Sequence, residues 1–179
     1  MNHIYGGAAR HLSLLTLMVA LGGCGKGTTT LKFASYSRAP LTAKLCLKRL
    51  RFKTGDSDTS TTNGNVDFSA GQITLTSTGT TIGDITLPAG TYKRVEFDME
   101  KDCLNTGALN SVEGTTSASA AFTSDKTITI KFLGTFEATS SAKTLEMGVQ
   151  NIATALNGLT GGSSADDVKT ALEAVSGTL

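Results

Sequence analysis

Imidazole, the side chain that most often performs acid–base and metal chemistry near neutral pH, occurs in this sequence only at His3 and His11. Both lie in an N-terminal segment with the pattern of a cleaved leader, so the remaining chain has no histidine. That composition excludes Ser-His-Asp and Cys-His nucleophiles, His-ligated zinc and facial-triad iron. Paired carboxylates, as in glycosidases, or a Ser-Lys pair could still act. We therefore expect a non-catalytic protein, with a carboxylate-dependent envelope hydrolase as an alternative.

The leader pattern occupies residues 1–23. Arg10 and no acidic residue precede an apolar run over residues 12–21, and two glycines then precede Cys24. A charged opening, a short apolar core and small residues before a cut are typical of a secretory signal that is too short to span a bilayer. Leu21-Gly22-Gly23-Cys24 resembles the lipobox of bacterial lipoproteins. The resemblance implies cleavage before Cys24 and diacylation of its thiol, with fatty acids such as palmitate.

The residue after Cys24 indicates the localisation of the protein. Gly25 in this position resembles the sorting signal for the outer membrane, which implies a lipid-anchored protein of the bacterial cell envelope, on its periplasmic or surface face. The small residues after it predict a flexible tether over residues 24–30.

The overall charge of the chain gives no reason to expect a strongly charged partner. The formal net charge is +1, and loss of Arg10 with the leader leaves the remaining chain neutral. We expect no nucleic-acid binding and no cofactor. The expected partners are the membrane, through the acyl chains, and an envelope protein or a glycan.

Two cysteines remain once the Cys24 thiol carries lipid. Cys46 and Cys103 form an even pair in an oxidising compartment, which favours a disulfide. Closing the loop of 57 residues between them (103 minus 46) stabilises a fold by about 4 kcal/mol on the chain-entropy model. The alternative is two buried free thiols.

Alternating apolar residues and turns rich in Gly, Asn, Asp and Ser predict a mainly β fold over residues 31–138. The predicted strands are 30–36, 42–53, 65–69, 72–77, 80–87, 91–101, 116–123 and 127–136. In segment 42–53, Leu45 and Leu47 have one parity while Leu50 and Phe52 have the other. An extra residue near Lys48-Arg49 would restore one apolar face, as a β-bulge does.

Two of these strands carry complementary charges. Segment 42–53 presents Lys44, Cys46, Lys48, Arg51 and Lys53 on its outer face, and segment 94–102 presents Arg94, Glu96, Asp98, Glu100 and Asp102. Opposite charges on facing strands contribute about 0.2–1 kcal/mol per pair, so the two strands favour antiparallel pairing. That pairing would bring Cys46 near Cys103 and Lys53 near Glu96, on an open outer face. The alternative is that the basic stripe binds an anionic ligand.

Leu87-Pro88-Ala89-Gly90-Thr91-Tyr92 predicts a tight corner between two strands, closed by the tyrosine ring and hydroxyl. With the following segment 93–97 it resembles the corner of transthyretin-like and collagen-adhesin B-type sandwiches. Ser37-Arg38-Ala39-Pro40 and Ile82-Gly83-Asp84-Ile85 also resemble a family of bacterial lipoproteins of unknown function. The resemblance covers residues 30–101 and implies a Greek-key β-sandwich without catalytic residues.

Beyond Ser140 the pattern changes to a helical period. Leu145, Val149, Ile152, Leu156 and Leu159 predict one amphipathic helix, and Ser164 predicts the N-cap of a second, with Val168, Ala171, Leu172 and Val175 on its apolar stripe. We therefore predict a two-helix hairpin within residues 139–179 that packs on the sandwich. The alternative is that its stripe docks a partner.

These inferences predict a lipid-anchored envelope protein with a structural or binding role. A surface adhesin is a further alternative, favoured if loops at one end of the sandwich converge into an exposed patch. A hydrolase would need two carboxylates about 5–10 Å apart in a cleft.

Segment 55–67 is the candidate metal site in this sequence. Asp56, Asp58 and Asp67 suggest calcium, but Thr61 and Asp67 stand where an EF-hand needs glycine and glutamate. We interpret the segment as a solvated connector and expect alanine at any of the three aspartates to change stability by no more than about 0.5 kcal/mol. Thermal melts with and without Ca²⁺ check this. A calcium-dependent rise of several degrees that Asp58→Ala abolishes would contradict it.

Overall fold

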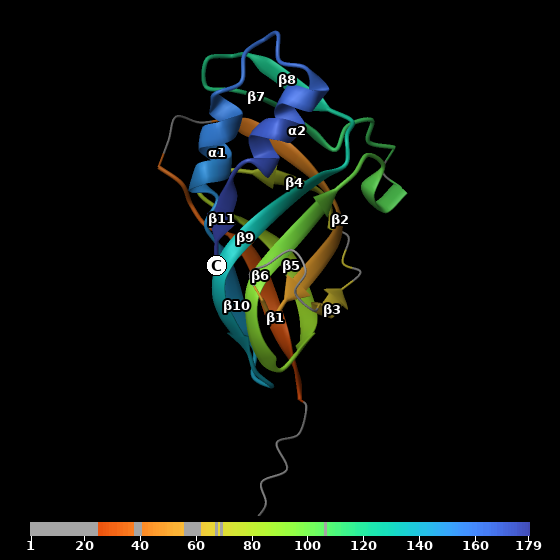
Figure 1. Cartoon of the computed structure of the whole chain (residues 1–179), viewed down its shortest axis with the longest axis vertical. Helices are drawn as coiled ribbons and strands as arrows, with labels where there is room; N and C mark the ends of the chain where they lie inside the picture. The colour runs from red at the N-terminus through yellow and green to blue at the C-terminus, as the bar shows by residue number, and fades with distance from the viewer. Residues whose placement is uncertain (1–24, 38–40, 56–61, 67, 69, 106) are drawn as a thin grey trace, which may run out of the picture.

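The computed structural model describes residues 25–37, 41–55, 62–66, 68, 70–105 and 107–179. Over these residues the chain is mainly β, with two sheets and two short helices near the C-terminus (Figure 1). None of the described helices is long and apolar enough to cross a bilayer. The predicted signal, Cys24 and the aspartates Asp56, Asp58 and Asp67 lie outside the described residues.

The described strands are β1 (Lys26–Phe33), β2 (Thr42–Lys53), β3 (Thr62–Val66), β4 (Gly71–Leu75), β5 (Thr80–Pro88), β6 (Gly90–Met99), β7 (Val112–Thr115), β8 (Ala121–Ser124), β9 (Ile128–Ala138), β10 (Lys143–Met147) and β11 (Ser176–Thr178). The helices are α1 (Gln150–Asn157), α2 (Ala165–Glu173) and the single turn η1 (Cys103–Asn105).

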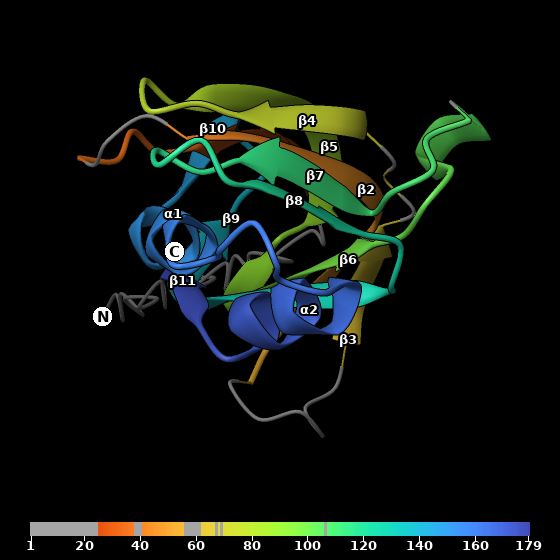
Figure 2. The same cartoon turned by 90° about the horizontal axis from the view of Figure 1, so that it is seen from above.

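The strands form a small and a large sheet around one core. The small sheet has the order β10-β1-β5, and the large sheet has the order β11-β9-β6-β2-β7-β8, with β3 and β4 paired to β2. Phe33 of β1 packs its ring 5.5 Å from that of Phe97 in β6 and 5.9 Å from that of Phe132 in β9. These aromatic contacts join the two sheets, and Figure 2 shows the strands from the end that carries the helices.

Strand β2 pairs with β6 through the predicted bulge. The antiparallel register shifts between Leu47 and Arg49, and the apolar residues on both sides of the shift, Leu47 and Leu50, are fully buried. The bounds of β2 are those expected from the sequence, and Arg51 faces Glu96. The predicted bulge and the predicted antiparallel pairing are confirmed.

The predicted tether over residues 24–30 is wrong from Lys26 onward, because residues 26–30 belong to β1. They pair antiparallel with β5, from Lys26 opposite Pro88 to Thr30 opposite Asp84. Gly25 also accepts a backbone hydrogen bond from Ala89 N at 2.9 Å. Glycine and threonine suggested flexibility, but the position of β1 between β5 and β10 supplies partners on both sides.

The C-terminal region is less helical than predicted. Residues 143–147 form β10, parallel to β1, and residues 176–178 form β11, parallel to β9. Leu145 and Met147 are buried in alternation with exposed Thr144 and Glu146, which is a strand period that the wider helical spacing concealed. The helix expected from Leu145 therefore begins only at Gln150.

The second helix is as predicted at its start. Ser164 caps α2 in a capping box, in which its side chain accepts from Asp167 N and the Asp167 side chain accepts from Ser164 N. Leu156 of α1 and Val168 and Leu172 of α2 are fully buried in the common core. The apolar stripes of the hairpin thus cover the described sheets, as the first of the two interpretations expects.

The predicted strand 116–123 is right only over residues 121–123. The chain forms two shorter strands, β7 and β8, joined by a turn in which Ser119 adopts a positive φ of 62°. Strands β7 and β8 pair with each other in antiparallel orientation, and β7 also pairs with β2 in the large sheet.

The corner between β5 and β6 forms as the motif predicts. Tyr92 is 1% exposed, its hydroxyl donates to Pro88 O at 2.9 Å, and its ring meets that of Phe52 edge-on at 5.5 Å. The glycine of the motif is less constrained than its sequence suggests, because a Cβ at Gly90 would meet nothing within 4 Å. A side chain at residue 90 would therefore have room in this corner.

These contacts give a matched pair of variants. Tyr92→Phe removes the hydrogen bond to Pro88 and should lower the free energy of unfolding by about 1 kcal/mol. Gly90→Ala, two residues away, should lower it by less than about 0.5 kcal/mol. Urea unfolding measures both, and an alanine at Gly90 as destabilising as the loss of the hydroxyl would contradict this reading of the corner.

Candidate functional site

Glu96 of β6 lies at the centre of a group of charged side chains on the face of the large sheet that points away from the small one. Its Oε1 lies 2.6 Å from Arg94 Nη2 and 3.7 Å from Lys53 Nζ. Its Oε2 lies 3.1 Å from Arg51 Nη2, and the same nitrogen donates to Asp98 Oδ1 at 2.6 Å. Three cations and two carboxylates therefore form one network, which we call the charged cluster.

The sheet register explains why these residues meet. Strand β6 lies between β2 and β9, so Glu96 has Arg51 on one side and Lys131 on the other. In the next row Asp98 faces Thr129 of β9, whose hydroxyl donates to the carboxylate at 2.8 Å. Alternation along the strands places these side chains on one face, since their sequence neighbours point into the core.

The open, solvated face expected from the sequence is wrong for the charged cluster. Arg94 is 2% exposed and Glu96 is 3% exposed. Long side chains from three adjacent strands crowd this face, and Glu173 at the end of α2 borders it by accepting from Thr129 N at 3.1 Å. Strand alternation gives the direction of a side chain but not what lies over it, so the burial could not be read from the sequence.

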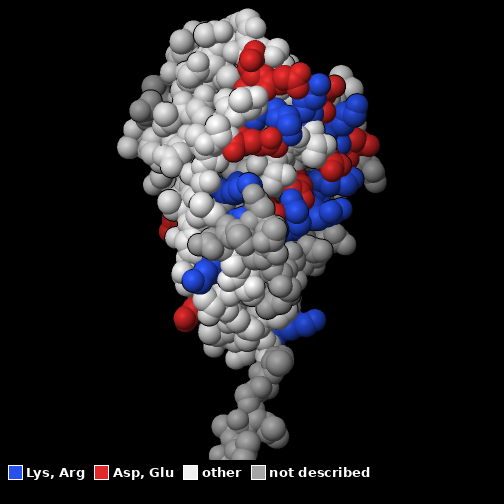
Figure 3. Space-filling view, in the orientation of Figure 1, with Lys and Arg blue, Asp and Glu red and all other residues white. Residues whose placement is uncertain are grey.

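A hollow of about 460 Å³ opens beside the charged cluster, lined by Arg51, Lys53, Glu96, Thr129, Lys131 and Glu173. Figure 3 shows that acidic and basic side chains mix in this region of the surface instead of forming one basic stripe. The self-neutralising interpretation of the two charged strands is therefore confirmed for Arg51, Lys53, Arg94, Glu96 and Asp98.

The two carboxylates that line this hollow are both engaged. Glu96 contacts three cations, and Glu173 accepts from Lys169 Nζ at 2.7 Å as well as from Thr129 N. A substrate would have to displace these contacts before either carboxylate could reach it. Within the described residues no group of three metal-ligating side chains occurs.

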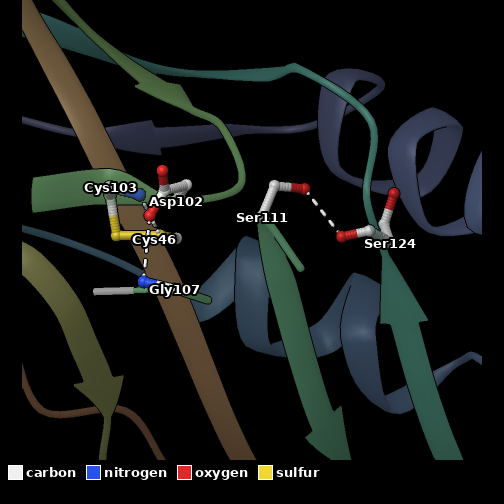
Figure 4. The surroundings of a disulfide bond; sticks show 6 residues. All are labelled: Cys46, Asp102, Cys103, Gly107, Ser111 and Ser124. Carbon is white, nitrogen blue, oxygen red and sulfur yellow. Dashed lines mark hydrogen bonds between the residues drawn. A yellow bond between two sulfur atoms is a disulfide. The ribbon is translucent and has the colours of Figure 1, made fainter. Parts of the chain in front are cut away.

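The predicted disulfide is present. Cys46 and Cys103 are bonded across a sequence separation of 57, with their Cα atoms 5.4 Å apart (Figure 4). Both residues are buried, and Cys103 N donates to Cys46 Sγ at 3.1 Å. The bond joins the outer face of β2 to η1, which follows β6.

The same part of the molecule is tied to the helices. Ser111 O accepts from Cys46 N at 2.8 Å, and the Ser111 hydroxyl donates to Ser124 O at 2.9 Å (Figure 4). The Ser124 hydroxyl then donates to Ala165 O at the start of α2. The disulfide is thus connected through β7 and β8 to the helical hairpin.

The loop held by the disulfide exposes large apolar side chains. Leu104 is 55% exposed and Leu109 is 82% exposed. Asp102 and Leu104 both adopt positive φ, of 58° and 54°, and the Asp102 carboxylate accepts from Gly107 N at 2.9 Å. Nothing in the sequence marks this loop, because isolated leucines between strands carry no period that identifies them as exposed.

Burial and hydrogen bonds shift the pKa of four described groups. Burial raises the pKa of Tyr36 and of Tyr92. The Asn110 amide, followed by Lys44, lowers the pKa of Glu113, and the backbone N–H of Ser164 lowers the pKa of Asp167. Tyr36 lies in the core, Tyr92 at the corner and Asp167 at a helix cap. Glu113 lies on β7 beside a second hollow of about 300 Å³, where it is paired with Lys44 at 3.2 Å.

No protein-family model, curated protein or solved structure matches this chain. The function therefore has to be inferred from the residues and their geometry.

The charged cluster makes one stability prediction. Glu96→Gln leaves buried cations without their central carboxylate and should lower the free energy of unfolding by about 3–5 kcal/mol. The matched control is Glu146→Gln, which breaks an exposed pair with Lys32 at 3.5 Å and should change it by less than about 1 kcal/mol. Denaturant titrations of both variants decide, and equal effects would show that the charged cluster is no more important than a surface pair.

Proposed function

We propose that this protein is a non-catalytic lipoprotein of the bacterial cell envelope, anchored by acyl chains on Cys24. Its domain would be a Greek-key β-sandwich with a structural or binding role. The observation that carries the proposal is the hydrogen bond from Ala89 N to Gly25 O. It fixes the residue after Cys24 to the domain, at the end opposite the two helices (Figure 1). Acylation there would hold the whole domain by one end.

The disulfide supports this compartment. Disulfides persist in the periplasm and on cell surfaces but are rare where thiols are kept reduced. A buried bond between the first long strand and the segment after β6 fits a protein that is exported before it folds.

The charged cluster supports a non-catalytic role. Its carboxylates contact cations on the protein itself, and the hollow beside it is lined by charges of both signs. Such an arrangement fits a structural network better than a hydrolase, which requires one carboxylate to protonate a leaving group and another to attack or activate water.

A binding role is supported at the end of the domain away from Gly25. There the disulfide holds a loop that presents Leu104 and Leu109, and Figure 1 shows its short green helix projecting from the upper right of the domain. Exposed apolar side chains beside a disulfide fit contact with a second envelope protein.

The proposed anchor is tested by replacing the sulfur atom of Cys24 with oxygen. The wild-type chain purified from envelopes should begin at Cys24 and carry diacylglycerol, as mass spectrometry of the N-terminal peptide would detect. Cys24→Ser should lose this group and leave the membrane fraction, while the matched variant Ser37→Ala should retain both. A membrane-bound chain with an unmodified Cys24 would refute the proposal.

A further inference from the structure

The proposed anchor leaves almost no chain between the membrane and the folded domain. Consecutive Cα atoms lie about 3.8 Å apart, so a lipid on Cys24 would be one residue from Gly25, which is bonded to Ala89. Lys26 already belongs to β1 and pairs with Pro88. The domain therefore cannot be held at a distance from the bilayer by a flexible segment after Cys24.

The end of the domain around Gly25 is built from the start of β1 and two turns. We call it the basal end and define it as residues 25–28, 88–93 and 137–143. The turn after β9 lies against β1, because a Cβ at Gly27 would collide with Thr139 O and touch Ser141 O. The turn after β5 is fixed by the hydrogen bond from Tyr92 to Pro88. Both turns are therefore held in place beside the anchor point.

The side chains of the basal end suit close contact with a charged, hydrated surface. Ala89, Gly90, Ser140, Ser141 and Ala142 are exposed and have short, uncharged side chains. They allow the backbone of both turns to approach lipid headgroups without burying large side chains.

The charged residues of the basal end are mostly lysines. Lys26 and Lys93 are exposed, and Lys143 is partly exposed with its Nζ donating to Glu137 O at 2.9 Å. One carboxylate, Glu137, accompanies them. Strands rise about 3.4 Å per residue, so Lys93 lies about 10 Å along β6 from Gly90. That distance is about one Debye length at physiological ionic strength, so these lysines would feel an anionic surface beneath the turns.

We propose that the basal end rests directly on the bilayer, with Lys26, Lys93 and Lys143 contacting anionic lipid headgroups. This inference rests on the proposed anchor at Cys24. A lysine close to an anionic surface gains about 1 kcal/mol, so the three lysines would orient the domain although the chain without its leader is neutral overall. The domain stands upright, and its helical end with the loop of Leu104 and Leu109 points away from the membrane.

Lysine labelling of the full, membrane-extracted protein tests this contact. The protein is reconstituted into vesicles of phosphatidylethanolamine and phosphatidylglycerol, or kept in a neutral detergent, and treated briefly with a water-soluble acetylating reagent. Labelling of Lys26 and Lys93 should be about fivefold slower on the vesicles, the factor that corresponds to about 1 kcal/mol. Lys44 and Lys126, exposed near β7 and α2, should change by less than about twofold.

A spacer variant isolates the short anchor as the cause. Ten Gly and Ser residues inserted between Gly25 and Lys26 have a root-mean-square span of about 17 Å, about twice the Debye length. Labelling of Lys26 and Lys93 should then return to within about twofold of the detergent value. Protection that survives the spacer contradicts the proposed cause.

The same samples separate this inference from the proposed function. Mass spectrometry of the N-terminal peptide reports acylation independently of the lysines. An acylated chain whose Lys26 and Lys93 react equally on vesicles and in detergent overturns the basal contact and leaves the anchor standing. A chain without the acyl group overturns both.

Discussion

The pairing of β2 with β6 in a bulged register is the constraint on which the rest of this structure depends. Before the bulge Leu47 faces the core, and after it Leu50 and Phe52 do. Because side chains alternate along a strand, a slip of one residue would send all of these apolar groups to the other face. The bulge lets one long strand keep its apolar side inward over its full length, so that β4 and β7 pair with its first half and β3 with its second.

The charged cluster and the disulfide both follow from that register. Arg51 meets Glu96 because they are opposite each other in it, and Cys46, on the same outer face, meets Cys103 beyond the end of β6. A buried ionic network adds little stability over well-packed apolar residues, whereas any other register would leave buried charges uncompensated. The charged cluster therefore contributes mainly by penalising wrong pairings of β2, and the disulfide retains the correct one.

The sequence predicted these long-range pairings because charge and parity are properties of strands that a linear pattern retains. Opposite signs on segments 42–53 and 94–102, together with a cysteine inside the first and another directly after the second, were enough to pair them. The same reasoning failed for Lys26 to Thr30 and for Lys143 to Met147. Those segments form the small sheet with β5, and they are strands because of partners that are distant in sequence. Thr29 lies opposite Lys143, and Lys26 lies opposite Pro88. Burial of Arg94 and Glu96 was missed for a related reason, since it depends on how three strands and α2 come together.

Of the wrong predictions, the flexible tether over residues 24–30 has the largest consequence for the proposed function. A flexible segment after Cys24 would have made the lower end of the domain irrelevant, because the domain could tumble above the membrane. With Gly25 bonded to Ala89, the proposed acyl anchor would act directly on the folded domain, so the composition of each end of the domain would matter. The net charge of the chain hides a difference between its ends, because the charged cluster pairs internally. The basal end carries Lys26, Lys93 and Lys143 against Glu137 alone, and the far end exposes Leu104 and Leu109. A domain held at its basal end by the proposed one-residue anchor would present to a partner the surface at its opposite end. There the disulfide ties the start of the segment that carries Leu104 and Leu109 to β2, and Asp102 accepts from Gly107 N, so that surface is joined covalently to the large sheet.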